Sequence, residues 1–333
     1  MMAKISVIIP AHNSESTIDL AISAVLRQKC RSEMEVIVVD DASTDGTVEI
    51  VKKFPVKLVA LEKNAGAGAA RNRGAAQASG DVLMFVDSDV YLESGALTRV
   101  EEFFERHPHF SALVGNYSSF PTERGACAVY HNFFTRYHHR LSDQEIEWFW
   151  GALSAIKKDV FDRLSGFLEQ YPGASAEDIE LGYRLAESDY QTAFVPGLRG
   201  AHARKFSFGS MLYNDYHKAV LGLKLYWLRR SGPKHKHGFA NPINGINVIL
   251  AALSWPAIVG FFACWWFLLL LLASFLAVNF KFYRYIQARA GWLYLITSVP
   301  LHWLCFNAIA AGTIAGAIGL VLGKGLESDS RWI

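Results

Sequence analysis

Three short runs decide the fold that the sequence predicts: residues 5–13 read ISVIIPAHN, residues 36–46 read VIVVDDASTDG, and residues 82–90 read VLMFVDSDV. Each begins with a continuous apolar or β-branched run, which is typical of a strand covered on both faces. With a fourth run, the expected strands are Ile5–Ile9, Val36–Val39, Lys57–Ala60 and Val82–Val86. Helical patterns lie between them, at 18–26, 46–53 and 67–78. This alternation predicts an α/β fold with a mostly parallel sheet flanked by helices.

Polar side chains follow three of these strands. They are His12-Asn13, Asp40-Asp41 and Asp87-Ser88-Asp89. Ligands of such sheets bind outside the carboxyl ends of the strands, so these clusters predict the binding edge. Asn13 or Ser14 is also expected to cap the first helix. Farther along, helices are expected at 94–107 and 176–187, with a strand at 191–195.

Asp87 and Asp89 are the strongest chemical signal. Two carboxylates two positions apart at a strand end can hold Mg²⁺ or Mn²⁺ together with diphosphate oxygens. Two acids in a turn are more often simply solvated. Their place after a buried strand, beside two other strand-end clusters, favours a metal site.

Two glycine-containing segments are compatible with a nucleotide site. Residues 40–46 (DDASTDG) predict a strand-to-helix turn, and an Asp there can also accept a hydrogen bond from a nucleobase. Residues 64–72 (NAGAGAARN) allow a helix to pack closely and leave room for a ligand. Arg71 stands where the third Gly of GxGxxG would be, which excludes a dinucleotide fingerprint. Arg71 could contact the nucleotide, pair with Asp41, or be a surface residue.

A second acidic pair opens the helix expected at 176–187, in the stretch AEDIELGYRL (176–185). Acids at a helix start stabilise the helix dipole, which is the structural interpretation. In the functional interpretation, a carboxylate here deprotonates an acceptor hydroxyl as a general base.

These motifs together resemble the family 2 glycosyltransferases, which have the GT-A fold. The resemblance covers about residues 4–205 and rests on ISVIIPAHNSESTI (5–18), VIVVDDASTDGT (36–47), NAGAGAARNRGAAQASGDVLMFVDSDV (64–90), GALSAIKKDVFDRLSGF (151–167) and AEDIELGYRL (176–185). It implies an inverting transferase that uses a nucleotide-diphosphate sugar and Mg²⁺ or Mn²⁺.

The resemblance also implies roles for single residues. Asp178, with Glu177 beside it, matches the family's ED motif and is the expected base, while Asp87 and Asp89 match the DxD motif. The residues expected to bind the nucleotide-sugar are Pro10, His12, Glu15, Asp41, Gly66, Arg71 and Asp87. His202 follows a strand where some relatives place a His near the metal. The QxxRW-like motif of processive synthases is missing, since the corresponding region reads HARKFSFGSMLYNDYHKA (202–219).

The C-terminal third has a different composition. From Arg199 to Lys236 there are nine Lys or Arg and one acid, Asp215. Two stretches follow that are almost free of charged side chains, Ile246–Phe280 and Gly291–Gly323. His302, in the second, is their one acidic or basic side chain. Each stretch exceeds the roughly 20 residues of one membrane span. A basic block and a basic linker, Lys281–Arg289, are typical of cytoplasmic flanks, which would make Ile246–Phe280 a hairpin. Residues 208–228 predict an amphipathic helix, in a membrane interface or packed on the core.

We therefore expect a catalytic domain at 1–205, a basic interface segment at 206–240 and a membrane anchor of two or more helices at 241–333. The four cysteines show no disulfide or metal spacing, and the N-terminal apolar run is too short for a signal peptide, so the catalytic domain is expected in the cytoplasm.

The expected reaction transfers a sugar, with UDP the commonest carrier in the family, to a hydroxyl of a lipid or lipid-linked glycan. A polyprenyl-phosphate acceptor is the alternative, and a non-catalytic membrane scaffold is less favoured. No nucleic-acid partner is expected, because the basic block adjoins apolar sequence.

Overall fold

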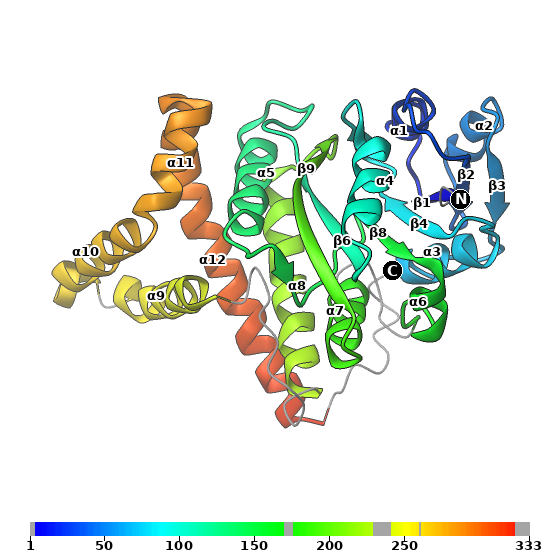
Figure 1. Cartoon of the computed structure of the whole chain (residues 1–333). Coiled ribbons are helices and arrows are strands. Elements are labelled where there is room, and N and C mark those ends of the chain that lie inside the picture. The colour runs from blue at the N-terminus through cyan, green and yellow to red at the C-terminus, as the bar shows by residue number, and fades with distance from the viewer. Residues whose placement is uncertain (1–3, 170–175, 229–240, 260, 324–333) are drawn as a thin grey trace. The chain divides into compact units, whose positions relative to one another are not determined.

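The computed structural model describes residues 4–169, 176–228, 241–259 and 261–323 (Figure 1). These residues divide into two compact units, 4–122 with 142–204 and 123–141 with 205–323. The first unit is an α/β domain, and the second consists of helices.

The first unit is built on one sheet. Its strands are β1 (Ile5–Ala11), β2 (Met34–Asp40), β3 (Lys57–Ala60), β4 (Val82–Val86), β5 (Val90–Leu92), β6 (Phe110–Tyr117), β7 (Glu145–Ile146), β8 (Leu153–Lys157) and β9 (Gln191–His202). Their order is β3-β2-β1-β4-β8-β6-β9-β5, with β7 paired to β9 outside that path. The four strands expected in the first 90 residues are present and adjoin one another.

The expectation of a mostly parallel sheet is correct for this N-terminal part, and beyond it β6 and β9 are the one parallel pair among the described strands. β3, β2, β1 and β4 are parallel neighbours. β8 runs antiparallel to both β4 and β6, and β5 and β7 run antiparallel to β9. Parallel pairing needs a crossover connection, usually a helix, and the regular strand–helix alternation ends after β4. The sheet is therefore mixed.

Helices cover both faces of the sheet. α1 (Ile18–Leu26), α2 (Thr47–Val51) and α4 (Ala96–Arg106) contribute to one core, and α3 (Ala67–Ala76), α6 (Lys158–Arg163) and α7 (Glu177–Glu187) to the other. Along β1, Val7 and Ile9 point into the first core and Ile8 into the second. This period of two explains why the strand is buried on both faces and, apart from Ser6, has no polar side chain.

The first helix is not capped as the sequence predicts. Thr17 occupies the N-cap position and makes no side-chain capping bond. The carbonyl of Ser14 accepts from the N–H groups of Thr17 and Ile18, at 3.0 and 2.9 Å. The Ser14 hydroxyl instead lies 2.8 Å from that of Ser88, so a tertiary partner has replaced the local cap.

The second unit contains α5 (Ala126–His139), α8 (Phe208–Leu228), α9 (Pro242–Val259), α10 (Phe261–Val278), α11 (Phe280–Ala290) and α12 (Trp292–Val321). α8 has the bounds expected from the sequence and packs along α12. Gly312 and Gly316 allow this approach, because a Cβ on Gly312 would collide with the Tyr216 carbonyl and one on Gly316 would lie 3.2 Å from the Val220 oxygen.

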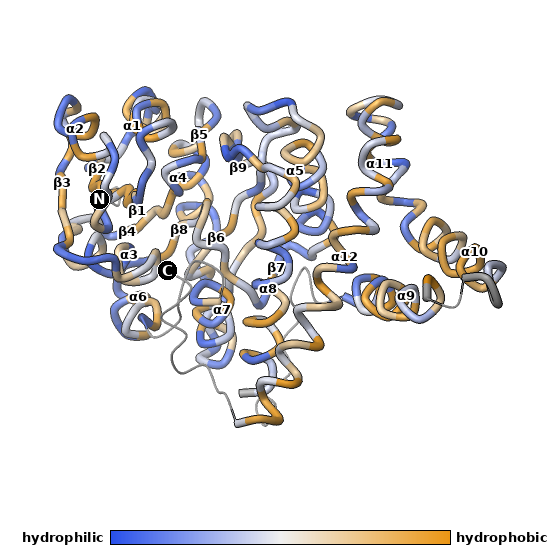
Figure 2. The backbone as a smooth tube through the Cα atoms, turned by 180° about the vertical axis from the view of Figure 1, so that it is seen from behind, coloured by the Kyte–Doolittle hydropathy of each residue, from blue (hydrophilic) through white to orange (hydrophobic). Residues whose placement is uncertain are grey.

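Apolar helices dominate the end of the described chain (Figure 2). Among the described residues, α12 is the one helix that is long and apolar enough to cross a membrane, with a mean hydropathy of 1.9. α10 and α11 add a second span only if they are counted as one helix pair, bent by 60°. The expected linker Lys281–Arg289 lies inside α11, and residues 229–240 of the basic segment lie outside the described residues.

Candidate active site

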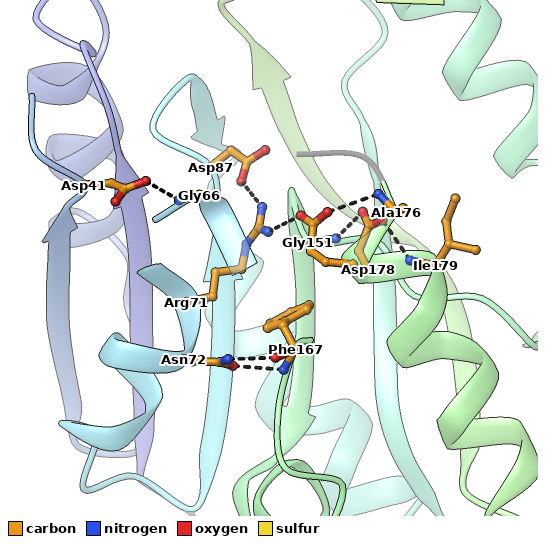
Figure 3. A network of polar contacts seen from close by, with 11 residues as sticks. Asp41, Gly66, Arg71, Asn72, Asp87, Gly151, Phe167, Ala176, Asp178 and Ile179 are labelled. Atoms are coloured by element: carbon orange, nitrogen blue, oxygen red, sulfur yellow. Dashed lines mark hydrogen bonds and ion pairs between the residues drawn. The ribbon is translucent and has the colours of Figure 1, made fainter. Parts of the chain in front are cut away.

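The carboxyl end of β2 fastens the loop that leads into α3. Both carboxylate oxygens of Asp41 accept backbone N–H groups, from Ala65 at 2.7 Å and from Gly66 at 2.8 Å (Figure 3). Gly66 has a φ of 88°, a conformation that favours glycine. His12 Nδ1 donates to the Asp41 carbonyl at 2.7 Å. Asp41 and His12 thus fix the shape of the strand-end edge.

Arg71 of α3 joins two carboxylates from distant parts of the chain. One guanidinium nitrogen lies 2.8 Å from Asp87 Oδ1 and another 2.9 Å from Glu177 Oε1. Figure 3 shows Arg71 between Asp87 and the start of α7. The Arg71 side chain is 3% exposed, and so is that of Glu177. Arg71 therefore does not pair with Asp41, and it is not a surface residue.

A glycine makes room for this guanidinium. A Cβ on Gly151 would lie 2.7 Å from the Arg71 Cζ. Burial acts to lower the pKa of Arg71, but the charges of Asp87, Glu177 and Asp178 outweigh it and raise the pKa above its ordinary value. Arg71 therefore carries a permanent positive charge inside an acidic cluster.

Asp87 and Asp89 lie in the turn after β4, with side chains 33% and 26% exposed. Burial raises the pKa of Asp87; the charge of Arg71 offsets this only in part, and Asp89 and Glu177 add to it. Burial also acts to raise the pKa of Asp89, but the hydrogen bond and charge of His202 and the charge of Arg204 lower it. The two acids thus differ in proton affinity, although only one residue separates them.

These acids fit a cation that shares its ligands with phosphate. His202 Nε2 lies 3.5 Å from Asp89 Oδ2, so an imidazole adjoins the pair. Among the residues that the structure describes, no three His, Cys, Asp or Glu side chains form a metal-binding group. An open pair of carboxylates is what Mg²⁺ or Mn²⁺ uses when substrate phosphates supply further oxygens.

Asp178 is held in a defined orientation at the first turn of α7. Its Oδ2 accepts the N–H of Gly151 at 3.1 Å, and its Oδ1 accepts the N–H of Ile179 at 2.8 Å. Glu177 is used differently, because one of its oxygens accepts from Arg71 and the other from the Ala176 N–H at 3.1 Å. Of the two acids expected to be catalytic, Asp178 is the less buried and Glu177 the ion-paired one.

The fold and these contacts can be compared with known proteins. The Glycosyl transferase family 2 model matches residues 6–165. Over these residues the chain is similar to the family 2 glycosyltransferases. The match includes Asp41, Arg71, Asp87, Asp89 and Gly151, and it ends before α7.

Curated relatives of this glycosyltransferase domain differ in length from the chain. The poly(ribitol-phosphate) beta-N-acetylglucosaminyltransferase TarS of Staphylococcus aureus is 40% identical over 119 residues, which are 34% of this chain and 21% of TarS. The glycosyltransferase AglE of Haloferax volcanii is 27% identical over 238 residues, 68% of this chain and 75% of AglE. The chain spans about a fifth of TarS and about half of YdaM, a probable glycosyltransferase of Bacillus subtilis.

Solved structures share the fold. A mannosyltransferase from Pyrobaculum calidifontis, in complex with GDP-Man and Mn²⁺, superposes with a TM-score of 0.60 at 19% identity, covering 97% of this chain and 88% of that one. Residues 1–349 of Staphylococcus aureus TarS give 0.50 at 22% identity, with 96% and 92% covered. At these identities the likeness shows a GT-A-like fold.

The other expected nucleotide-site residues of the glycosyltransferase domain lie along the same edge. Pro10 is buried in β1 opposite Val39. Glu15 is exposed and its Oε2 accepts the Gly46 N–H at 3.2 Å, which ties it to the turn before α2. Both residues therefore have structural partners.

Sequence reasoning missed an aromatic row beside the acids. The Tyr117 ring stacks on His202, with centroids 4.4 Å apart, and meets the Trp150 ring edge-on at 4.7 Å. Burial and the charges of Asp89 and Asp87 raise the pKa of Tyr117 well above its ordinary value. Tyr117 is the last residue of β6, just as the polar clusters stand at the ends of β1, β2 and β4. This position at a strand end is the sequence feature that could have identified Tyr117 as a site residue.

Proposed function

We propose that this chain transfers a sugar, with inversion, from a nucleotide-diphosphate sugar to an acceptor hydroxyl. The observation that carries the proposal is the arrangement of Asp87, Arg71 and Asp178 within and just beyond a family 2 glycosyltransferase domain. Sugar transfer is also the activity in the names of the relatives, and the mannosyltransferase of similar fold was solved with GDP-Man. We extend these properties to this chain as a proposal.

Asp178 is the proposed general base. Two backbone N–H groups hold its carboxylate, which is less buried than that of Glu177. Asp178 takes the acceptor's hydroxyl proton while that oxygen forms a bond to the anomeric carbon. The bond from that carbon to the diphosphate oxygen breaks on the opposite face, which inverts the configuration. The nucleoside diphosphate leaves with the bonding electron pair.

Asp87 and Asp89, with His202 beside them, are the proposed holders of Mg²⁺ or Mn²⁺. When bound, the cation neutralises charge on the diphosphate leaving group. Arg71 keeps Asp87 in place and balances part of the negative charge of the acidic cluster. Asp41 and His12 shape the nucleotide end of the site through the loop before α3.

The acceptor is proposed to be a lipid or lipid-linked glycan at the cytoplasmic face of a membrane. The apolar α12 and the basic residues near it support a membrane-bound enzyme. By length and composition α12 gives one span, and the bent pair α10 and α11 would add a second if it counted as one helix.

Release of nucleoside diphosphate tests this function. Purified full-length protein is given a panel of nucleotide-sugars with Mg²⁺ or Mn²⁺, then with a chelator. We expect release from at least one donor, lost with the chelator and in Asp89→Ala. Asp81→Ala, at an exposed acid near the opposite end of β4, is the matched control and should retain activity. No release from any donor, as for a scaffold, would refute the proposal.

A further inference from the structure

α9 and α10 are arranged with their apolar side chains outward. In α9 the exposed residues include Ile246, Ile249 and Ile258, which are 44%, 59% and 54% exposed. In α10, Trp266 and Leu269 are 58% and 54% exposed. On α9, Ile246 and Ile249 form an apolar stripe with Leu253, which is 43% exposed, at spacings of three and four positions, and Trp266 and Leu269 are three positions apart on α10. A hairpin stable in water would bury such stripes.

The polar side chains of this pair are turned inward and satisfied. The Asn247 and Asn279 amides exchange two hydrogen bonds, at 2.9 and 2.8 Å, and their side chains are buried. Ser254 Oγ donates to the Ala251 carbonyl at 2.6 Å. Hydrocarbon solvates no polar group, so internal satisfaction of this kind is what a lipid environment requires.

The Asn247–Asn279 contact also fixes the direction of the two helices. It joins the start of α9 to the residue that follows α10. The N-terminus of α9 and the C-terminus of α10 therefore lie together, at what we call the open end of the hairpin. Each helix has 18 residues, or about 27 Å at the α-helical rise, close to the roughly 30 Å of a bilayer core. No Asp, Glu, Lys, Arg or His lies between Pro242 and Asn279.

α11 begins at this open end and has a cationic outer face. Lys281, Arg284 and Arg289 are exposed, whereas Phe282 and Tyr285 are buried. The charged residues of the surrounding sequence are also all basic. From Tyr216 to Leu326 there is no Asp or Glu, against ten Lys or Arg: six from Lys218 to Lys236, three in α11, and Lys324. Such a surface complements anionic lipid headgroups.

We propose that α9 and α10 are a hairpin inserted into an anionic bilayer from one face, with α11 lying on the headgroups of that face. The bilayer's hydrocarbon covers the exposed stripes, and its phosphates pair with Lys281, Arg284 and Arg289. In the competing arrangement, α10 and α11 together cross the membrane. Lys281, Arg284 and Arg289 would then lie in the hydrocarbon or on its far side. The proposal does not depend on sugar transfer.

Side-specific cysteine labelling tests the hairpin. Ile243→Cys and Arg289→Cys are made in full-length protein whose native cysteines are replaced by alanine, and intact spheroplasts and inverted vesicles are treated with a membrane-impermeant maleimide. The two positions should label from the same side. Leu20→Cys in the first unit, 48% exposed, is the control for reagent access. Labelling from opposite sides would overturn the proposal.

Two further results decide the proposal without relying on the cysteine background. Trypsin cleavage of the unaltered chain in the same vesicles should cut after residues 229–236 and after 281–289 from one side only. Cell-free synthesis with phosphatidylglycerol vesicles should yield vesicle-bound protein, and neutralising Lys281, Arg284 and Arg289 to Gln should weaken that binding by roughly fivefold per charge. A soluble dimer formed without lipid would show that a second copy covers the stripes, and would refute it.

Discussion

At the residue scale, the account assigns different tasks to two adjacent acids. Asp178 is held by backbone N–H groups and is less buried, whereas Glu177 is buried against Arg71. A general base must lie within hydrogen-bond reach of the hydroxyl whose proton it takes. The pair is therefore one base and one structural anchor.

Asp178→Asn tests the base. Asparagine keeps the size of the side chain, and its one amide oxygen can accept from either Gly151 or Ile179, so the fold and donor binding should be retained with a loss of about 1 kcal/mol in stability. Turnover should fall by about 10²- to 10⁴-fold, the usual contribution of a general base. Donor affinity is measured by calorimetry and turnover by nucleoside diphosphate release, with Asp159→Asn at an exposed ion pair as control. Full turnover in Asp178→Asn would exclude this base.

Arg71→Met tests the anchor. It leaves Asp87 without its guanidinium partner and Glu177 without a counter-charge in a buried position, which should lower the free energy of unfolding by about 3 kcal/mol or more. Arg71→Lys should recover only part of this, because one ammonium cannot reproduce the fork between two carboxylates. Arg73→Met, on the same helix but 55% exposed, should cost less than about 1 kcal/mol. Equal losses in urea unfolding for Arg71→Met and Arg73→Met would contradict the assignment.

The positions of the key acids could be predicted from the sequence, but their partners could not. Asp87, Asp89 and Asp178 stand out because they follow a strand or open a helix. Arg71 lies 106 positions from Glu177, and no periodic pattern connects residues so far apart. The ion pair forms because the fold brings α3 and α7 together on one face of the sheet.

At the scale of elements, local patterns predicted the four N-terminal strands and the start of β9, but they missed β5, β6, β7 and β8. β3 and β4 have the expected bounds; β4 is apolar and buried throughout, whereas β3 is an edge strand with exposed ends. The cap of α1 was wrong because Ser88, 74 positions away, engages the Ser14 hydroxyl. The way in which the strands after β4 pair could not be predicted from apolar runs. An apolar run predicts that a strand forms, but not which strand lies beside it.

Glu35 makes a pH-dependent contribution to the sheet. Its carboxylate accepts from Ser6 Oγ at 2.6 Å and from Ser79 N and Oγ at 2.7 Å. Burial acts to raise the pKa of Glu35, but the hydrogen bonds from Ser6 and Ser79 outweigh it and lower the pKa. Stability from a lowered pKa is present above the unfolded value of about 4.3 and is lost as the pH falls through the folded value.

We therefore expect Glu35→Gln to lower the free energy of unfolding by about 1 kcal/mol at pH 7, with a smaller difference below about pH 4. Urea unfolding at the two pH values measures this. Glu33→Gln, at a side chain 86% exposed, is the control and should change little at either pH. A difference that grows on acidification would have the wrong sign for this account.

The contact of α8 with α12 predicts opposite effects for two glycines. Gly312→Ala introduces a Cβ against the Tyr216 carbonyl and should lower thermal stability, by about 1–3 kcal/mol as overpacking does. Gly222→Ala on α8 meets nothing within 4 Å and should stabilise the helix by up to about 1 kcal/mol. Thermal unfolding of full-length protein in detergent compares them. A destabilised Gly222→Ala, or a stabilised Gly312→Ala, would contradict the packing described.

At the scale of the whole molecule, the chain combines an α/β glycosyltransferase domain with a helical unit rich in exposed apolar side chains. Composition predicted this change of character near residue 205. It did not reveal that α5, within the first 205 residues, groups with the C-terminal helices. The reason is that α5 has mixed composition, and its partners α11 and α12 lie far along the chain.

The central claim is sugar transfer to a membrane acceptor through a hydroxyl. Its most direct test incubates membranes containing the protein with labelled nucleotide-sugars, extracts the lipid, and treats the labelled lipid with mild acid. We predict label in the lipid that is absent with Asp178→Asn and that survives the acid, as a glycoside does. Label released quickly would reveal a sugar phosphodiester and contradict the hydroxyl acceptor, and no label from any donor would contradict the claim itself.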